Sequence, residues 1–530
     1  MTLRKSSTRV LFSLLLVVVL SGVLATSAQD LPQGGRIVVA DGASNVSLDP
    51  FVTSWHSWPH YALFPTLFTR DENMEYVGFL ADTWEIGDDG LSLTINLIQT
   101  ATFTDGTPVN AEAIKYNLDK YANPDTGASQ GADLIGLLLS TEVVDEYTLK
   151  LNLASSFAPL FFVLANLEIV SPTAYEALGP ESFGTAPVGA GPFMLKELNT
   201  NNYVLFERNP DFNWAPPELY DYPGPVPADE FQVLFLDEDQ TILSALETGE
   251  VTIAGVPTQN LPDVEANPDI TVNVAQLNEL RYVGFNTSKA PWDNLELRRA
   301  LAYATDRDEV NALAYDSLAE SVGQPLPSSI WGHNPELDAK AVQYDPERAA
   351  AMLDELGYVD VTGDGLRETP EGTEWAVPLA VTSSDEYMRI AQVIDAEWRA
   401  VGIPLEIQPM ERSALIDLTT TGTHDLFLLG YGYSDPSILT YFFDPDRRGG
   451  SNRAWMVNDD LTASLVAADT ELDQALRYEK VTAASELIME LQPWIFLVSP
   501  PSLTGVRNEL QNWVINPDLS FLYWNAHFGG

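Results

Sequence analysis

The chain has 530 residues and no cysteine, and its 76 acidic residues outnumber its 27 basic residues, which gives a formal net charge of −49. The absence of thiols excludes disulfides, thiolate metal sites, a cysteine nucleophile and a lipid anchor on cysteine. The charge argues against nucleic acid as a partner, because binding to phosphate backbones needs clustered Lys and Arg. The acidity fits a solvated surface, and it also fits a field that attracts cationic ligands.

The first 28 residues have the pattern of a secretory signal. Three basic residues precede an apolar run at residues 10–20, and small residues follow up to Ala28. This run is too short to span a bilayer, which needs roughly 20 apolar residues. We therefore expect cleavage after Ala28, or after Ala25, and export of the remaining chain to the periplasm or the cell exterior, in association with the cell envelope.

Signals for strands and helices alternate along the chain. Residues 91–97 and 147–153 alternate apolar with other residues at the period of half-buried strands. Between them, Asn110 has the character of a helix N-cap, and Ile114 and Leu118 follow on one helical face. The mixture predicts an α/β fold.

Further helices are predicted in the second half of the chain. One begins at Asn294, and another has Asp345 as its N-cap, Pro346 at its first position and Gly357 as its terminator. Amphipathic stretches follow at residues 385–401 and 472–491. Turn-rich stretches that could separate domains lie at residues 179–192, 209–227 and 286–293.

Several segments, in their order and spacing, are similar to a known family. They are Ser47-Leu48-Asp49-Pro50, residues 103–112 (from Phe103 to Glu112), Gly189-Ala190-Gly191-Pro192-Phe193, Val283-Gly284-Phe285-Asn286-Thr287, residues 298–307 and residues 344–349. On these segments the chain resembles the extracellular solute-binding proteins of family 5, cluster C type, which serve peptide, nickel and oligosaccharide importers of the ABC type. The resemblance covers nearly the whole mature chain, and we expect most of these residues to support the fold more than to contact a ligand.

The resemblance implies a periplasmic-binding-protein-like α/β fold with two lobes, a hinge and an additional inserted domain. The boundaries it implies are residues 30–72, 185–285 and 500–530 for a discontinuous lobe one, 73–184 for the inserted domain and 286–499 for lobe two. It further implies a monomer without catalytic residues, which captures an oligosaccharide or a peptide between its lobes and delivers this ligand to the membrane subunits of an ABC importer.

The first candidate for a ligand contact is an aromatic segment near the amino terminus. Trp55, His56 and Trp58 follow the Asp-Pro pair of the resemblance, and such rings could stack on sugars or on side chains in a cleft. The alternative is an aromatic cluster in the core of lobe one. Tyr282 and Asn286, at the entry to lobe two, are weaker candidates.

The second candidate follows the apolar strand predicted at residues 426–429 and contains Tyr431, Gly432, Tyr433 and Asp435. In peptide-binding members of the family, an aspartate four residues before the equivalent proline pairs with the α-amino group of the peptide. Gly432 occupies that position here, so the resemblance argues against free di- and oligopeptides unless Asp435 takes the role. It favours oligosaccharides or other polar organic ligands, which the two tyrosines could contact. A turn without a binding role is the alternative.

A loop near the middle of lobe two has the spacing of a calcium loop. Asp360, Thr362, Asp364 and Glu371 place oxygen atoms at its positions 1, 3, 5 and 12, and a glycine lies at position 6. The threonine and a proline at position 11 depart from the pattern. The loop predicts either a structural calcium site or a simple Asp/Gly turn.

Two other functions compete with transport. A secreted glycosidase could use a pair of carboxylates, but in so acidic a chain some pair always looks suitable, and no nucleophile elbow, zinc helix or phosphate loop is present. A binding protein that signals to a sensor, instead of an importer, would need the same two closing lobes.

Overall fold

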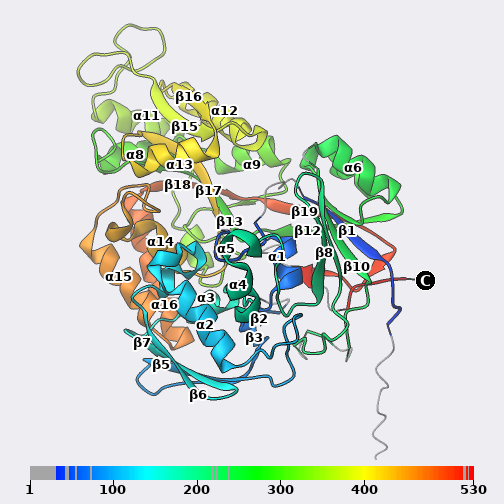
Figure 1. Cartoon of the computed structure of the whole chain (residues 1–530). Helices are drawn as coiled ribbons and strands as arrows, with labels where there is room; N and C mark the ends of the chain where they lie inside the picture. The colour runs from blue at the N-terminus through cyan, green and yellow to red at the C-terminus, as the bar shows by residue number, and fades with distance from the viewer. Residues whose placement is uncertain are drawn as a thin grey trace, which may run out of the picture.

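The structure is a computed structural model, and it describes residues 31–41, 47–53, 57–71, 74–216, 219–220, 224–236, 238–516, 521–522 and 525–529. The predicted signal at residues 1–28 lies outside these ranges. Helices and strands mix throughout, which confirms the α/β prediction, and three larger sheets organise them (Figure 1). None of the described helices combines the length and the apolar character that a membrane crossing requires.

Lobe one is built on a seven-stranded sheet whose strands come from three distant parts of the chain. Their order is β12-β19-β11-β1-β10-β9-β8, with β1 parallel to both β10 and β11. The strands are β1 (Arg36–Asp41), β8 (Phe193–Asn199), β9 (Tyr203–Arg208), β10 (Glu230–Phe235), β11 (Ile253–Gly255), β12 (Ile270–Gln276) and β19 (Pro501–Arg507). The helices with this sheet are α1 (Trp58–Leu63), α6 (Asp239–Thr248), η3 (Thr258–Asn260) and α7 (Leu261–Glu265).

Three short ribbons complete this part of the chain. They are β2 (Phe68–Arg70) with β3 (Tyr76–Gly78), β20 (Leu510–Gln511) with β23 (His527–Phe528), and β21 (Val514–Ile515) with β22 (Phe521–Leu522).

The inserted domain has a four-stranded antiparallel sheet with the order β4-β5-β7-β6, comprising β4 (Ala81–Ile86), β5 (Ser92–Leu97), β6 (Leu138–Asp145) and β7 (Thr148–Leu153). The predicted alternation is confirmed, because Leu93, Ile95 and Leu149 are fully or almost fully buried. The helices are α2 (Ala111–Tyr121), η1 (Pro124–Thr126), η2 (Ser129–Leu134), α3 (Leu160–Ala165), α4 (Pro172–Leu178) and α5 (Pro180–Phe183). Helix α2 begins at the predicted cap, since the Asn110 side chain accepts a hydrogen bond from the backbone N–H of Ala113.

Lobe two is built on a six-stranded mixed sheet with the order β14-β18-β13-β17-β15-β16. The strands are β13 (Glu279–Phe285), β14 (Glu320–Ser321), β15 (Val377–Thr382), β16 (Leu405–Met410), β17 (Leu426–Gly432) and β18 (Trp494–Ser499). The helices are α8 (Leu295–Tyr303), α9 (Arg307–Tyr315), α10 (Pro335–Asp338), α11 (Pro346–Glu355), α12 (Asp385–Ala400), α13 (Arg412–Thr420), α14 (Ile438–Phe443), η4 (Pro445–Arg447), α15 (Asp459–Thr470) and α16 (Gln474–Leu491).

The predicted helix signals of lobe two are confirmed at their ends. The Asp345 carboxylate accepts the backbone N–H of Arg348 at the start of α11, and Gly357 follows the helix with a φ of 86°. The Asn294 side chain caps α8 in the same way. Apolar faces of these helices pack on the two sides of the sheet, in two separate buried clusters.

The chain crosses between the lobes at two adjacent points. β12 of lobe one runs through Leu277 and Asn278 into β13 of lobe two, and β18 returns through Pro500 into β19. The Ser499 hydroxyl donates a hydrogen bond to the Leu277 carbonyl and so ties the crossings together. Since β13 pairs along its length with β17, it belongs to the sheet of lobe two, and the predicted boundary after Phe285 lies one strand too late.

Candidate functional site

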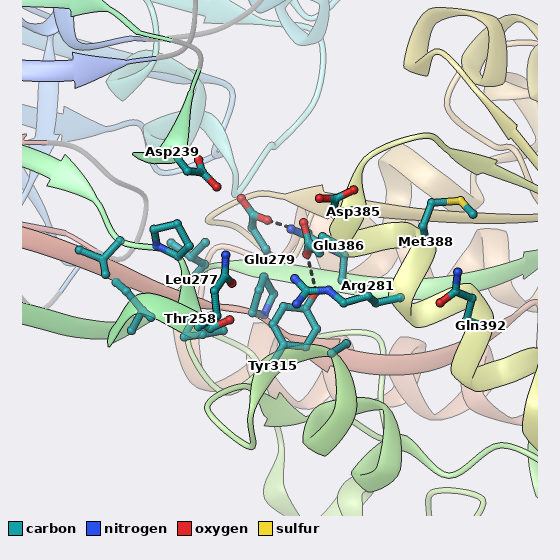
Figure 2. Close-up of a pocket in the computed structure, with 18 residues that line it drawn as sticks. Asp239, Thr258, Leu277, Glu279, Arg281, Tyr315, Asp385, Glu386, Met388 and Gln392 are labelled. Carbon is teal, nitrogen blue, oxygen red and sulfur yellow. Dashed lines mark hydrogen bonds and ion pairs between the residues drawn. The ribbon is translucent and has the colours of Figure 1, made fainter. Parts of the chain in front are cut away.

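A cavity of about 630 Å³ lies between the lobes, beside the two crossings (Figure 2). Both lobes contribute to its wall, as does the crossing segment itself. The lining residues are Asp239, Val256, Pro257, Thr258, Gln259 and Leu503 from lobe one, Leu277, Pro500 and Pro501 at the crossings, and Glu279, Arg281, Ala314, Tyr315, Asp385, Glu386, Met388, Arg389 and Gln392 from lobe two. A space of this size accommodates a small organic molecule.

The topology of the sheets explains why the cavity forms here. β10 and β11, which both run parallel to β1, end just before the lining segments that contain Asp239 and residues 256–259. In lobe two, β15 ends just before α12, whose first turn carries Asp385 and Glu386. In open α/β sheets, the crevice outside the carboxyl ends of parallel strands is the usual place for a ligand.

A charged cluster forms the lobe-two wall of the cavity. The Arg281 guanidinium donates from Nη1 to the Glu279 carboxylate at 2.6 Å and from Nε to the Glu386 carboxylate at 2.8 Å. The Tyr315 hydroxyl donates to the same Glu386 oxygen, and burial together with the Glu386 charge raises the pKa of this tyrosine far above its usual range. The Arg281 side chain is only 10% exposed, so two carboxylates already satisfy its charge within the wall.

The lobes also contact each other away from this cavity. The Arg447 guanidinium pairs with the Asp133 carboxylate at 3.0 Å across the gap between lobe two and the inserted domain. The backbone N–H of Ala158 donates to the Asp469 carbonyl at 2.7 Å. Burial raises the pKa of the Asp469 carboxyl to about 6. These contacts join lobe two to the inserted domain.

An aromatic pair joins the same two parts of the molecule. The Phe162 ring of α3 lies 4.4 Å, centroid to centroid, from the Tyr433 ring that follows β17. Tyr433, predicted from the sequence as a ligand contact, thus lies at the interface between lobe two and the inserted domain, and it does not line the cavity. Gly432, the exposed last residue of β17, faces Glu279 of the cavity wall.

The amino-terminal candidates are only partly described. Trp55 and His56 lie outside the described residues. Trp58 begins α1, and its half-buried ring packs against the hydrophobic cluster of lobe one, which agrees with the alternative of a core aromatic cluster.

Two predicted tyrosine contacts lie inside lobe two, which corrects the prediction for them. The Tyr282 side chain is 1% exposed and stacks on Trp494 with the ring centroids 3.6 Å apart. The Tyr431 ring belongs to the same aromatic cluster, and its hydroxyl donates to the Pro325 carbonyl. Both tyrosine rings are buried because β13 and β17 are central strands of a sheet whose two faces are both covered.

Asn286 is a second correction, because it has a structural role. Its side chain is completely buried, and its amide donates to the carbonyls of Gly422 and His424. This fixes the turn before β17. Burial of His424 lowers the pKa of its imidazole to about 4.

Asp435 is a third correction. Its carboxylate makes a two-pronged ion pair with Arg477 of α16, at 2.8 Å and 3.2 Å, and the two side chains are only 6% and 10% exposed. The same carboxylate accepts the backbone N–H of Ser437. The Asp435 carboxylate is therefore engaged by partners in the interior of lobe two.

The predicted calcium loop forms a turn stabilised by its own backbone. The Asp360 carboxylate accepts the backbone N–H groups of Gly363 and Gly365, and the Asp364 carboxylate accepts that of Leu366. Among the described residues, which include this whole loop, no three His, Cys, Asp or Glu side chains gather as a metal site would require. The calcium site at Asp360, Thr362, Asp364 and Glu371 stays a prediction, with the simple turn as its alternative.

Sequence reasoning missed the charged wall of the cavity. Glu279, Arg281 and Glu386 belong to no recognisable motif, and 105 residues separate Arg281 from Glu386. One signal was present, because residues 384–386 follow a buried strand and begin a long helix. Such a junction marks the edge of an α/β sheet where ligands bind.

Comparison with known proteins agrees with this geometry. Residues 75–451 match the family described as bacterial extracellular solute-binding proteins, family 5 Middle. The glutathione-binding protein GsiB of Pectobacterium atrosepticum is 27% identical over 511 residues, covering 92% of this chain and 93% of the relative. The probable D,D-dipeptide-binding periplasmic protein DdpA of Escherichia coli is 26% identical with the same coverage of both chains.

A solved structure confirms the two-lobed fold that the sequence predicted. The oligopeptide-binding protein AppA of Bacillus subtilis, in complex with a nonapeptide, superposes with a TM-score of 0.81. The match covers 94% of this chain and all of the AppA chain, at 20% sequence identity.

Proposed function

We propose, on the premise that this chain belongs to the bacterial extracellular solute-binding proteins of family 5, that it captures a peptide-like solute between its lobes and delivers it to an ABC importer. Membership in this family makes the chain a solute-binding protein and not an enzyme, so the glycosidase alternative is set aside. The matched residues span most of the inserted domain and much of both lobes.

One observation carries the proposal: the cavity of about 630 Å³ has walls from both lobes and from the crossing segment. A ligand there would contact both lobes at once, and hinge bending at the crossings would open and close the space around it. Lobe two is also joined to the inserted domain by the ion pair of Arg447 with Asp133 and by the ring contact of Phe162 with Tyr433. Binding energy would therefore be coupled to closure.

The relatives favour a peptide-like ligand over an oligosaccharide. The two curated relatives described above are named for glutathione and for D,D-dipeptides, and AppA was solved with a nonapeptide. The sequence argument for oligosaccharides rested on Gly432 and on ring contacts from Tyr431 and Tyr433. Tyr431 lies in the core of lobe two, and neither ring lines the cavity, which weakens that argument.

The place of action follows from the same family and from the amino-terminal pattern. The family is extracellular by description, and the predicted signal at residues 1–28 would direct export. We propose a monomer that works outside the cytoplasm and presents its closed form to the importer.

The experiment that tests this function is a binding screen on the mature chain. Intrinsic tryptophan fluorescence is recorded while dipeptides, tripeptides, glutathione and cello- or xylo-oligosaccharides are added, and the ligand is afterwards recovered and identified by mass spectrometry. We expect a saturable change with at least one peptide-like compound, recovered unchanged. Saturation by an oligosaccharide alone would refute the proposed ligand class, and conversion of the compound would refute a pure binding function.

A further inference from the structure

The cavity between the lobes has an uneven charge. Four carboxylates line it, from Asp239, Glu279, Asp385 and Glu386, against the two guanidinium groups of Arg281 and Arg389. This proportion is no more acidic than that of the whole chain, with its 76 acidic and 27 basic residues. The number of carboxylates therefore does not define a ligand, and the argument depends on how they are arranged.

The arrangement leaves Arg281 without charge to offer a ligand. Its guanidinium lies between the Glu279 and Glu386 carboxylates and is almost fully buried in the wall. The cluster of these three residues keeps one net negative charge, and Asp385 begins the same helix turn as Glu386. A carboxylate of a ligand would meet repulsion beside this cluster, whereas a cation would meet attraction.

Glu279 is the carboxylate of this cluster that lies toward lobe one (Figure 2). Its Oε2 atom accepts from Arg281, while its Oε1 atom has no hydrogen-bond partner in the part of the chain that the structure describes. The Glu279 and Glu386 side chains are 29% and 31% exposed, and the two bonds of Glu386, from Arg281 and from the Tyr315 hydroxyl, both end on its Oε1 atom. Figure 2 shows Glu279 between Glu386 on the lobe-two side and Asp239 on the lobe-one side.

Gly432 is the reason that the Glu279 carboxylate has this space. The two residues face each other in the antiparallel pair of β13 and β17. A Cβ atom on Gly432 would lie 3.2 Å from Glu279 Cγ and 3.4 Å from Glu279 Oε1, so a larger residue there would crowd the carboxylate. The Glu279 carboxylate of β13 thus occupies the space that a side chain at position 432 of β17 would take.

We propose that Glu279 anchors a cationic group of the ligand, so that the protein selects solutes that carry an ammonium or guanidinium group at this end of the cavity. The anchor rests on the proposed function, since it assigns a charge to the peptide-like ligand of the same cavity. A charge-assisted hydrogen bond from the ligand to Glu279 Oε1 supplies the selectivity. Asp239 lies on the opposite lobe, so a bound cation also reduces the repulsion between carboxylates that closure brings together.

The test compares three peptides of one length on the mature chain by isothermal titration calorimetry. Tri-alanine carries its cation at the amino terminus, N-acetyl-Ala-Lys-Ala carries it on a side chain, and N-acetyl-tri-alanine carries none. We expect one or both cationic peptides to bind about 10- to 100-fold more tightly than N-acetyl-tri-alanine, as the gain from one charge-assisted bond predicts. The tighter of the two cationic peptides shows whether the α-amine or a side chain supplies the cation.

The Glu279→Gln variant removes the charge and keeps the shape. Because Arg281 stays paired with Glu386, the variant should fold, which a thermal melt verifies. We expect its preference for the cationic peptide to fall about 10- to 100-fold, with binding of N-acetyl-tri-alanine unchanged. The matched control is Glu296→Gln, which removes an arginine-paired glutamate on the surface of α8, outside the cavity, and should leave the preference intact.

A second variant tests the geometry directly. In Glu279→Ala combined with Gly432→Asp, the carboxylate moves to the facing position of the neighbouring strand, and we expect the preference for the cationic peptide to return in part. The inference is overturned if Glu279→Gln keeps the full preference, or if all three peptides bind equally well; in the second case the proposed peptide-binding function stands. If neither these peptides nor any compound of the screen binds, the proposed function falls and the anchor falls with it.

Discussion

The buried ion pair between Asp435 and Arg477 gives a sharp test of the interior of lobe two. Replacement of Arg477 by methionine keeps the apolar stem and removes the guanidinium, and it leaves the Asp435 carboxylate buried without its partner. The pair is two-pronged, at 2.8 Å and 3.2 Å, and the side chains are 6% and 10% exposed. For so buried a pair, the loss of one partner costs about 3–5 kcal/mol of unfolding free energy.

A second variant also removes the Asp435 charge that Arg477→Met leaves without a partner. The double variant Arg477→Met with Asp435→Asn retains a side-chain oxygen that can accept the Ser437 N–H and carries no buried charge. We expect it to recover about 2–3 kcal/mol relative to Arg477→Met, because most of the cost of the single change is the unpaired carboxylate. Lys340→Met is the control: Lys340 pairs with Glu486 at 2.5 Å, but with side chains 56% and 41% exposed, so its loss should cost less than about 1 kcal/mol.

Urea unfolding followed by tryptophan fluorescence measures these differences. The reasoning is refuted if Arg477→Met destabilises the protein no more than Lys340→Met does, or if the double variant is less stable than the single one.

Three further predictions concern pH and closure. Burial raises the pKa of Glu397 to about 8, so the folded state holds a proton that the unfolded state loses above about pH 4.5. The free energy of unfolding therefore falls as the pH rises from 4.5 to 8. Glu397→Gln should flatten this slope in urea titrations and raise the free energy of unfolding by about 3 kcal/mol at pH 7. Burial lowers the pKa of His424 to about 4, so on acidification the unfolded state binds a proton before the folded state does. The free energy of unfolding therefore falls by up to about 3 kcal/mol as the pH drops from 6.5 to 4. His424→Asn should remove this part of the acid sensitivity in thermal melts between pH 4 and 7. Phe162→Ala removes the ring contact with Tyr433 between the inserted domain and lobe two, and it should weaken ligand binding by about 2- to 10-fold in calorimetry. Unchanged affinity would show that this contact does not favour closure.

Local chemistry made much of the fold predictable from the sequence. The caps at Asn110 and Asp345 and the alternation in β5 and β7 each depend on residues within one helix turn or one strand. The two-lobed architecture followed from the ordered segments of the family resemblance, which carry information that a single element does not. The predicted boundary after Phe285 followed the turn-rich stretch at residues 286–293, whereas the pairing of β13 with β17 assigns β13 to lobe two.

The site was less predictable, because its residues meet only through pairing and packing. Tyr282 and Tyr431 looked like cleft residues on account of their type and their place next to turns, yet both strands are central and covered on two faces. The partner of Asp435 is Arg477, 42 residues later in α16, and no sequence signal links the two residues. In each case a polar or aromatic side chain near a predicted cleft had an internal partner that the sequence does not reveal.

Gly432 shows most clearly why a substitution in a family motif cannot be interpreted from one strand alone. In the sequence, a glycine where peptide-binding relatives carry an aspartate argues that the anchor for a cation is absent. In the sheet, the register of β13 against β17 places Glu279 opposite that glycine, at a distance where a side chain on residue 432 would crowd it. Since side chains facing each other across paired strands share one volume, the loss of a carboxylate on one strand and its gain on the other can leave the charge of a site unchanged. The charge of a binding site therefore depends on both paired strands together. To predict the ligand preference of such a protein, the residues that face each other across the strands have to be considered as pairs.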